Sequence, residues 1–169
     1  EDAINNYIKI GRKPKAIILV HLYGFPAKLD QFLEISNKYN IPIVEDAAEA
    51  IGSKYKDQPL GTFGEIGIFS FNGNKIITTS SGGALISKNK EFIKKAKFLA
   101  TQSRDNSPHY EHSEIGYNYR MSNVCAAIGI GQLEVLESRV LKRRFIFNYY
   151  KEKLSSIPFI SFVDDLDEY

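Results

Sequence analysis

A strand, a helix and a second strand follow one another near the start of the chain. Residues 15–20 form a short apolar run, rich in branched side chains and bounded by glycine and proline, which predicts a buried strand. Residues 30–39 repeat apolar side chains at helical spacing after Asp30, the predicted N-cap, and residues 41–45 predict a second buried strand. Strands joined in this way lie parallel, with a right-handed crossover. The pattern therefore predicts an α/β fold with parallel strands.

The remaining elements extend this plan towards the end of the chain. Residues 65–71 and 82–87 predict two further strands, and Asn89 is suited to cap a helix that runs to about residue 100. Residues 101–120 contain a proline, a glycine and many polar groups, which predicts a loop long enough to be functional. Residues 122–154 repeat apolar side chains at helical spacing without a proline, so one continuous helix is expected there.

Charge and composition exclude several classes of function. The 169 residues include 22 basic and 20 acidic side chains that are mixed along the sequence, and the basic run 142–144 is interpreted as a solvated helix face. No stretch approaches the roughly 18 apolar residues of a membrane span. The single cysteine, Cys125, cannot form an intramolecular disulfide. These features favour a cytoplasmic protein without a nucleic-acid or membrane partner.

Three side chains with complementary chemistry lie near the ends of the predicted strands. Asp46 follows one strand at the edge where open α/β sheets bind ligands, Ser70 lies near the end of the next, and Lys75 follows in a polar turn. Taken singly, the aspartate could cap a turn, the serine could be a turn residue and the lysine could be a surface charge. Together they supply an anion for a pyridinium ring, a hydroxyl for a phosphate and an amine for a Schiff base, which predicts a pyridoxal phosphate site.

Four ordered motifs connect these residues to a known family. The motifs are His21–Gly24 (HLYG), Glu45–Glu49 (EDAAE), Phe69–Thr79 (FSFNGNKIITT) and Gly116–Asn123 (GYNYRMSN). In order and spacing they resemble the DegT/DnrJ/EryC1/StrS sugar aminotransferases over residues 15–155. The Asn72–Lys75 form of the lysine loop looks most like enzymes that aminate the 4-keto carbon of UDP-linked 4-keto-6-deoxy-N-acetylhexosamines.

The resemblance implies a three-layer α/β/α fold with a mostly parallel sheet, the large domain of a fold-type-I pyridoxal phosphate-dependent transferase. Residues 1–155 are expected to form part of that large domain, and residues 156–169 to begin the connection to a small C-terminal domain. Because family members are roughly twice as long, the chain looks truncated at both ends. The segments that it lacks normally supply a phosphate-binding helix N-terminus and an aromatic group that stacks on the ring, so the chain alone is expected to be inactive.

The resemblance also implies a role for each matching residue. Lys75 is expected to form the Schiff base and to move a proton during catalysis, while Asp46 pairs with the pyridinium nitrogen and Ser70 binds the phosphate. Glu49 stands where the family often has glutamine or histidine near the cofactor hydroxyl, so its carboxyl must be protonated or otherwise accommodated. Asn118 is expected to reach the phosphate of the neighbouring subunit, which implies a homodimer with a shared active site.

The reaction implied by the resemblance is transamination, in which glutamate supplies an amino group and a nucleotide-linked ketosugar receives it by way of pyridoxal phosphate. A related dehydratase branch replaces the lysine by histidine, so Lys75 speaks against it. The alternative is a non-catalytic module that keeps the cofactor fold for binding or regulation. His109 and His112 lack the setting of a metal pair, and together with His21 and Arg104 they are expected to line the sugar-nucleotide side.

Overall fold

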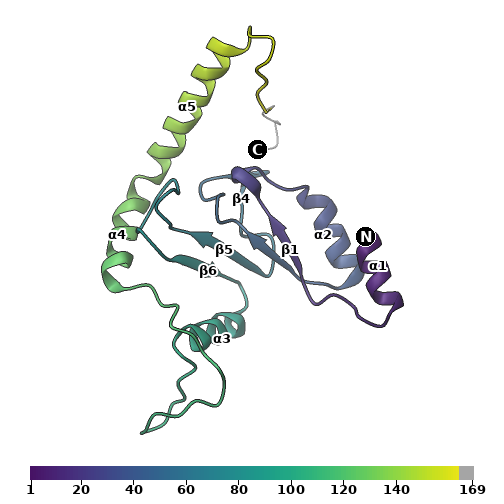
Figure 1. The fold of residues 1–169 in the computed structure, drawn as a ribbon, viewed down its shortest axis with the longest axis vertical. Helices are drawn as coiled ribbons and strands as arrows, with labels where there is room; N and C mark the ends of the chain where they lie inside the picture. Colours follow the sequence, from purple (N-terminus) through teal and green to yellow (C-terminus); the bar gives the residue numbers. More distant parts are fainter. Residues whose placement is uncertain (164–169) are drawn as a thin grey trace.

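The computed structural model of the chain describes residues 1–163 (Figure 1). Its helices are α1 (Asp2–Lys9), α2 (Leu29–Tyr39), α3 (Lys90–Ala100), α4 (Asn123–Glu134) and α5 (Leu136–Leu154), with a short 3-10 helix at Leu22–Gly24. Its strands are β1 (Ile17–Val20), β2 (Ile43–Asp46), β3 (Lys54–Tyr55), β4 (Gln58–Pro59), β5 (Ile66–Ser70) and β6 (Gly83–Ile86). All four strands predicted from the sequence are therefore confirmed, and the β3–β4 pair is additional.

A four-stranded sheet in the order β1-β2-β5-β6 lies at the centre of the fold. β1 pairs parallel with β2, as expected for strands joined by a helix, and β2 pairs parallel with β5. Only β6 is reversed, because it runs antiparallel to β5. The expected α/β class with a mostly parallel sheet is confirmed. The hand of the β1–α2–β2 crossover stays a prediction.

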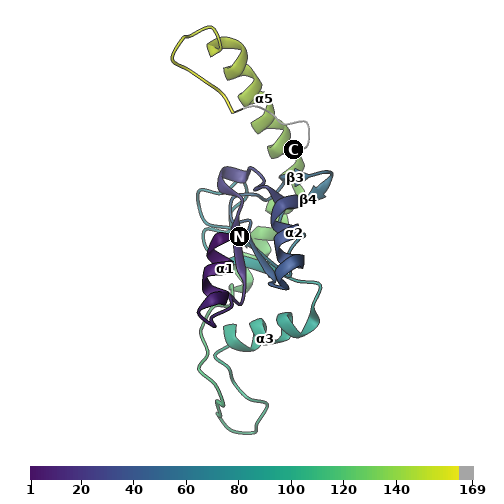
Figure 2. The ribbon, with the colours of Figure 1, turned by 90° about the vertical axis from the view of Figure 1, so that its right-hand side faces the viewer.

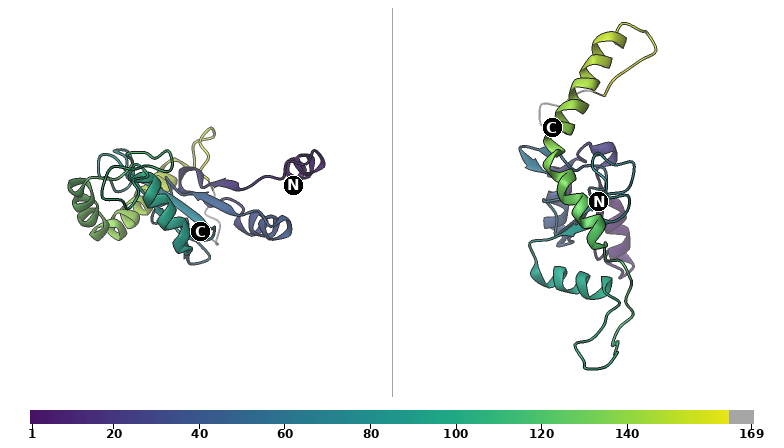
Figure 3. Two further views of the ribbon diagram at one scale, coloured as in Figure 1. Left: turned by 90° about the horizontal axis from the view of Figure 1, so that it is seen from below. Right: turned by 90° about the vertical axis from the view of Figure 1, so that its left-hand side faces the viewer.

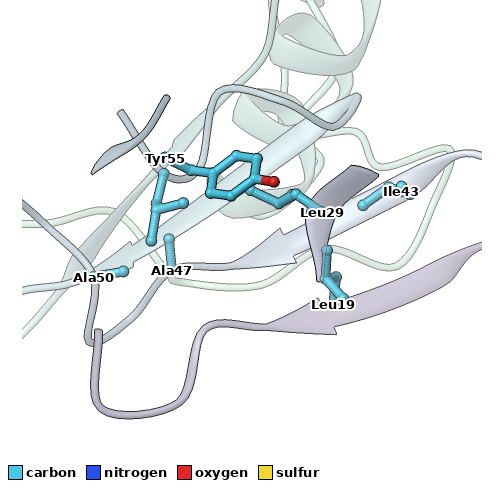
Figure 4. Packing of buried hydrophobic residues seen from close by; sticks show 7 residues of the cluster. Leu19, Leu29, Ile43, Ala47, Ala50 and Tyr55 are labelled. Carbon is cyan, nitrogen blue, oxygen red and sulfur yellow. The ribbon is translucent and has the colours of Figure 1, made fainter. Parts of the chain in front are cut away.

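Helix α2 contributes side chains to the core on one face of this sheet, and Figure 4 shows the cluster of buried residues. Leu29 of α2 is fully buried against Leu19 of β1 and Ile43 of β2. Ala47, Ala50, Tyr55 and Leu60 complete the buried cluster. Full burial of a leucine or isoleucine side chain stabilises a fold by about 2 kcal/mol, so this cluster anchors the ends of β1 and β2.

The opposite face of the sheet carries apolar side chains that remain accessible to solvent. Strand residues alternate between the two faces, and Ile18 and Val20 of β1 share this second face with Ile68 of β5 and Leu85 of β6. All four are exposed. A helical layer over this face, the third layer of the expected arrangement, stays a prediction.

Asp30 does not cap α2, contrary to the prediction. The helix begins one residue earlier, at Leu29, after Lys28, which makes no side-chain capping bond. The Asp30 carboxylate instead accepts hydrogen bonds from the Tyr55 hydroxyl at 2.8 Å and from Lys56 Nζ at 2.6 Å. Lys56 and Asp57 both have positive φ in the turn between β3 and β4. The aspartate therefore ties α2 to this small hairpin, a contact that helix-cap rules could not predict.

The single helix predicted over residues 122–154 is in fact two helices. Ser122 does cap its start, because its hydroxyl accepts the N–H of Cys125. At Val135, however, φ is −104° and ψ is 4°, and the N–H bonds to the carbonyl of Gln132, three residues back. The hydroxyl of Ser138 donates to the Val135 carbonyl, which also accepts the regular helical bond from the Arg139 N–H. No proline or glycine occupies the break, so sequence rules gave no signal for it.

Two parts of the chain project from opposite ends of the sheet region (Figures 1 and 2). Helix α5 extends from one end, and the loop between α3 and α4 extends from the other. Figure 3 shows that α1 and α4 lie at opposite sides of the sheet, beyond β1 and β6 respectively. Asn89 caps α3 as predicted, through the N–H of Glu91. None of the described helices is long and apolar enough to cross a membrane.

The predicted domain boundary at residue 155 coincides with the end of a helix, since α5 ends at Leu154. Residues 156–163 contain neither helix nor strand. The rest of the predicted connection, residues 164–169, lies outside the described residues. The assignment of this segment as a link to a second domain stays a prediction.

Candidate active site

Two of the predicted site residues end neighbouring parallel strands. Asp46 is the last residue of β2, and Ser70 is the last residue of β5. Asp46 aligns with Ile68, so Ser70 lies two residues further along on the same face of the sheet. The carboxylate and the hydroxyl are thus offset by about 7 Å along the strand direction. Both side chains are half-buried and both form local turns, with Ala48 N–H at 3.1 Å from Asp46 and Asn72 N–H at 3.3 Å from Ser70.

The carboxylate that precedes Asp46 points the other way, into the protein. Glu45 is fully buried and accepts hydrogen bonds from His21 Nε2 at 3.0 Å, and from three backbone N–H groups. Those N–H groups belong to Gly61, Phe63 and Gly64. Burial by itself would raise the pKa of the Glu45 carboxyl, but these four donors outweigh it and hold the pKa below its ordinary value.

The structure brings two more of the predicted site residues into contact. Lys75 Nζ lies 3.4 Å from Oε1 of Glu49, while the backbone N–H of Tyr23 donates to Oε2 of the same carboxylate at 2.9 Å. The Lys75 side chain is mostly enclosed, with 15% of its surface exposed, so its amine has few directions of approach. This pair is held between the turn after β1 and the lysine loop.

Glu49 therefore acts as a hydrogen-bond acceptor here and not as a donor. The pKa of its carboxyl lies below the ordinary value, first because it accepts the Tyr23 N–H and further because Lys75 is close, although partial burial opposes the shift. The sequence had left open whether this carboxyl is protonated or otherwise accommodated. In this structure an amine and a backbone amide accommodate its charge.

A pocket of about 450 Å³ opens beside this pair. It is lined by the turn Tyr23–Pro26, by residues of the segment 48–54, by Asn74–Ile76, and by Val140, Arg143, Arg144 and Phe147 of α5. Its charged groups are four cations and one anion, Lys54, Lys75, Arg143 and Arg144 against Glu49. Such a lining suits an anionic ligand with an apolar portion.

The contribution of α5 to this pocket was missed in the sequence. The basic run 142–144 predicts a solvated helix face, and both arginines are indeed exposed, but they also face the pocket. Tyr23 was missed as well, because its backbone N–H and not its side chain makes the contact, with φ at 55°. A backbone amide leaves no signal in residue type.

Asn118 lies away from these residues. It forms an isolated bridge with Thr101, in the segment that joins α3 to α4, and is not among the residues that line the pocket. Asp46 and Ser70 do not line the pocket either. The predicted reach of Asn118 into a neighbouring subunit stays a prediction.

The residues expected to line a sugar-nucleotide side are dispersed. His21 is buried, with 1% of its surface exposed, and its ring is committed to Glu45 and to Ala27 N–H, so the expectation for it is wrong. The guanidinium of Arg104 lies 4.2 Å from the ring centroid of Tyr110. His109 and His112 lie in the exposed loop of residues 101–120. Within residues 1–163, no group of three or more histidine, cysteine or acidic side chains could hold a metal ion.

The donor set fits pyridoxal phosphate in kind and in location. An enclosed amine, a half-buried carboxylate and a hydroxyl come from the ends of adjacent parallel strands and the loop that follows, which is where open α/β sheets bind cofactors. Ala47 packs into the buried core, whereas Ala48, which is small and half-buried, lines the pocket beside Glu49. The residues therefore match the cofactor in their functional groups and in their location at one edge of the sheet.

Comparison with known proteins gives a consistent result. The sequence profile of the DegT/DnrJ/EryC1/StrS aminotransferase family matches residues 1–168. EpsN of Bacillus subtilis strain 168, whose name describes it as a pyridoxal phosphate-dependent aminotransferase, is 52% identical over 165 residues, which are 98% of this chain and 42% of that protein. GDP-perosamine synthase of Escherichia coli O157:H7 is 44% identical over 149 residues, 88% of this chain and 41% of the synthase.

A solved structure shows the same fold. A DegT DnrJ EryC1 StrS aminotransferase from Brucella abortus superposes with a TM-score of 0.84 at 32% sequence identity, covering 92% of this chain and 42% of that one. The chain thus spans about two fifths of the length of the proteins it matches.

Proposed function

The chain belongs to the DegT/DnrJ/EryC1/StrS aminotransferase family, and from that membership we propose that it serves in transamination dependent on pyridoxal phosphate. The proposed acceptor is a nucleotide-linked 4-keto-6-deoxy sugar, and the proposed amino donor is glutamate. The observation that carries this proposal is the Lys75 amine, enclosed against Glu49 at the same sheet edge as Asp46. The product would enter the synthesis of amino sugars for glycans or surface polysaccharides.

Each site residue has a task that follows from its position. Pyridoxal phosphate, when bound, supplies an electron-withdrawing ring that accepts and returns the amino group. Lys75 would hold the cofactor covalently and, once displaced, carry a proton between the donor's α-carbon and C4′ of the cofactor. Asp46 would pair with the ring nitrogen, and Ser70 would bind the phosphate through its hydroxyl. Glu49 would keep the Lys75 amine in place while it is not bonded to the cofactor.

The charge of the pocket supports a nucleotide-linked substrate. Lys54, Arg143 and Arg144 bring positive charge to one opening beside Lys75. Phosphate groups of a nucleotide match such a set of cations, and the apolar side chains of Phe25 and Phe147 suit a ring. The name GDP-perosamine synthase, carried by one relative, points to a nucleotide sugar, and the resemblance of the lysine loop favours UDP as the nucleotide.

We further propose that the active site is shared within a homodimer. Asn118, which pairs with Thr101 and is not among the residues that line the pocket of its own chain, would reach the phosphate bound by a second copy. The exposed apolar side chains of α4 and α5 also suit an interface between subunits.

Covalent trapping tests the central role of Lys75. Intact protein mixed with pyridoxal phosphate should become yellow, and borohydride should fix the cofactor on the peptide that contains Lys75. Lys75→Ala should abolish trapping, whereas Lys54→Ala, which removes a second lysine from the same pocket, should leave the label on Lys75. Label on another lysine, or none at saturating cofactor, would overturn the assignment and favour the non-catalytic module.

A further inference from the structure

The buried ring of His21 connects the sheet to the turn that precedes the site. Its Nδ1 lies 3.2 Å from the backbone nitrogen of Ala27, whose N–H can only donate, so Nδ1 must accept. The proton of the neutral ring is therefore on Nε2, which donates to Glu45 at 3.0 Å. The backbone N–H of His21 also donates to the carbonyl of Asp46 at 3.1 Å. One residue thus fixes both ends of the turn and the end of β2.

The turn held in this way controls the position of Glu49. Residues 22–24 form a single 3-10 turn, closed by the N–H of Gly24 on the carbonyl of His21, in which Tyr23 has left-handed φ at 55°. A tyrosine rarely adopts that conformation without support, and the turn spans only the five residues between His21 and Ala27. In this conformation the Tyr23 N–H donates to one oxygen of the Glu49 carboxylate, and the other oxygen accepts from Lys75.

We propose that His21 is a positioning residue for the Glu49–Lys75 pair. Through the Ala27 contact it holds the turn in which the Tyr23 N–H fixes the Glu49 carboxylate against the amine. The inference rests on the proposed role of Lys75 as the reactive amine. In this proposal the buried imidazole of His21 acts on the Glu49–Lys75 pair without contacting either residue.

Two substitutions separate the two contacts of the ring. In His21→Asn, the oxygen of the new side-chain amide can occupy the place of Nδ1 and accept from Ala27, but the amide cannot reach Glu45. The longer amide in His21→Gln can occupy the place of Nε2 and donate to Glu45, but it leaves Ala27 N–H without its acceptor. Both variants lose one buried hydrogen bond and should lose stability. Only the glutamine variant should release the turn.

The readout is the rate at which an amine reagent labels Lys75 in cofactor-free intact protein, relative to Lys54. The Glu49 carboxylate holds the Lys75 amine in a place where only 15% of the side chain is exposed, so Glu49→Gln, which removes the charge attraction, should let the amine move into solvent and should raise relative labelling about two- to fivefold, the range that a part-exposed ion pair supports. His21→Gln should raise it equally, and His21→Asn should keep the wild-type rate. The double variant His21→Gln, Glu49→Gln should label no faster than Glu49→Gln alone, because both act through one contact.

Several outcomes would overturn the proposal. A wild-type labelling rate in His21→Gln would contradict it. So would a double variant that labels faster than Glu49→Gln alone by the full His21→Gln effect, because a merely structural role of His21 predicts that result. If His21→Gln does not fold, His21→Asn alone decides, because faster labelling in that variant contradicts the Ala27 route. Labelling needs no bound cofactor, so a failure of the borohydride experiment remains distinct from a failure here.

Discussion

The sheet region, residues 15–87, and the helical region, residues 122–154, differ sharply in what they bury. Every buried apolar residue in the described part of the chain lies between Leu19 and Ile77. Helices α4 and α5 contain no buried residue at all. Their exposed apolar side chains include Val124, Ile128, Ile130, Leu133, Leu141, Phe145 and Ile146.

Composition does not explain this difference, because both regions are rich in apolar side chains. The sheet region supplies its own facing surface, since α2 folds back over β1 and β2. The helical region has no such surface within residues 1–163, and its apolar side chains suit a second copy of the protein or further parts of it. The buried apolar residues that stabilise this chain therefore lie in the sheet region, whereas the helices carry the exposed apolar side chains to which we assign the proposed association.

The largest effect is expected at the buried carboxylate of the sheet region. Both oxygens of Glu45 face two donors each, so in Glu45→Gln the new amide group must meet donors in either orientation. We expect a loss of about 2–6 kcal/mol in the free energy of unfolding of the intact protein, measured by urea denaturation, because two buried donors are left unsatisfied at about 1–3 kcal/mol each. Glu134→Gln, an exposed counterpart in α4, should change it by less than about 0.5 kcal/mol. Comparable losses in both variants would contradict the comparison.

The stability lost in Glu45→Gln should also depend on pH, in a direction that the pKa of Glu45 defines. The folded pKa of Glu45 lies below its ordinary value of 4.5, so the unfolded chain binds the proton more tightly. The contribution to stability is fully present above 4.5 and is lost as the pH falls through the lower folded value. The difference between wild type and Glu45→Gln should therefore be constant at about pH 6 and above and should shrink in acid. A difference that grows in acid would exclude this account.

An intermediate effect is expected where the two regions meet. Gly52 has φ at +89°, and a Cβ built there would lie 2.7 Å from Cγ2 of Val140 in α5. Gly52→Ala should cost about 1–3 kcal/mol through backbone strain and should lift α5 from the turn. Hydrogen exchange should then show faster exchange in α5 but unchanged protection in β1 and β2. Gly73→Ala, with no atom within 4 Å of the new Cβ, is the matched control. Loss of protection in both regions would show that they unfold together.

The smallest effect on stability is expected on the surface of α5. Phe145 is 69% exposed, so Phe145→Ser should change the free energy of unfolding by less than about 0.5 kcal/mol. If the helical region serves association, the same change should weaken the dimer of the intact protein by about tenfold or more in sedimentation experiments. Arg139→Ser, an exposed polar position on the same helix, should leave the dimer intact. An unaltered dimer in Phe145→Ser would remove Phe145 from the interface.

Local patterns predicted the strands and most helices because those patterns are set by neighbours in sequence. Asn89 and Ser122 cap helices as expected, since a cap needs only the residues that follow it. Asp30 has the same cap signature but bonds to Tyr55 and Lys56, which lie 25 and 26 residues away in sequence and come close only in the tertiary fold. The break at Val135 likewise depends on contacts that no periodicity records.

The site was predictable where chemistry resides in side chains and unpredictable where it resides in backbone or register. The family motifs pointed to Asp46, Glu49, Ser70 and Lys75, and the structure brings Glu49 to Lys75. The N–H of Tyr23 is invisible in the sequence. The burial of His21 follows from the pairing of Leu19 with Glu45, which places His21 on the inner face beside that carboxylate.

Glu45 and Asp46 are adjacent residues on opposite faces of β2, one enclosed and one at the site. Deleting or inserting a single residue within that strand would exchange their orientations, since side chains alternate at every position. The interior would then receive a carboxylate in the wrong place, and the sheet edge that we propose binds the cofactor would lose the carboxylate of Asp46. A single-residue insertion in this strand would therefore be tolerated only if a β-bulge absorbed the extra residue, whereas the loops around the strand can change length more freely.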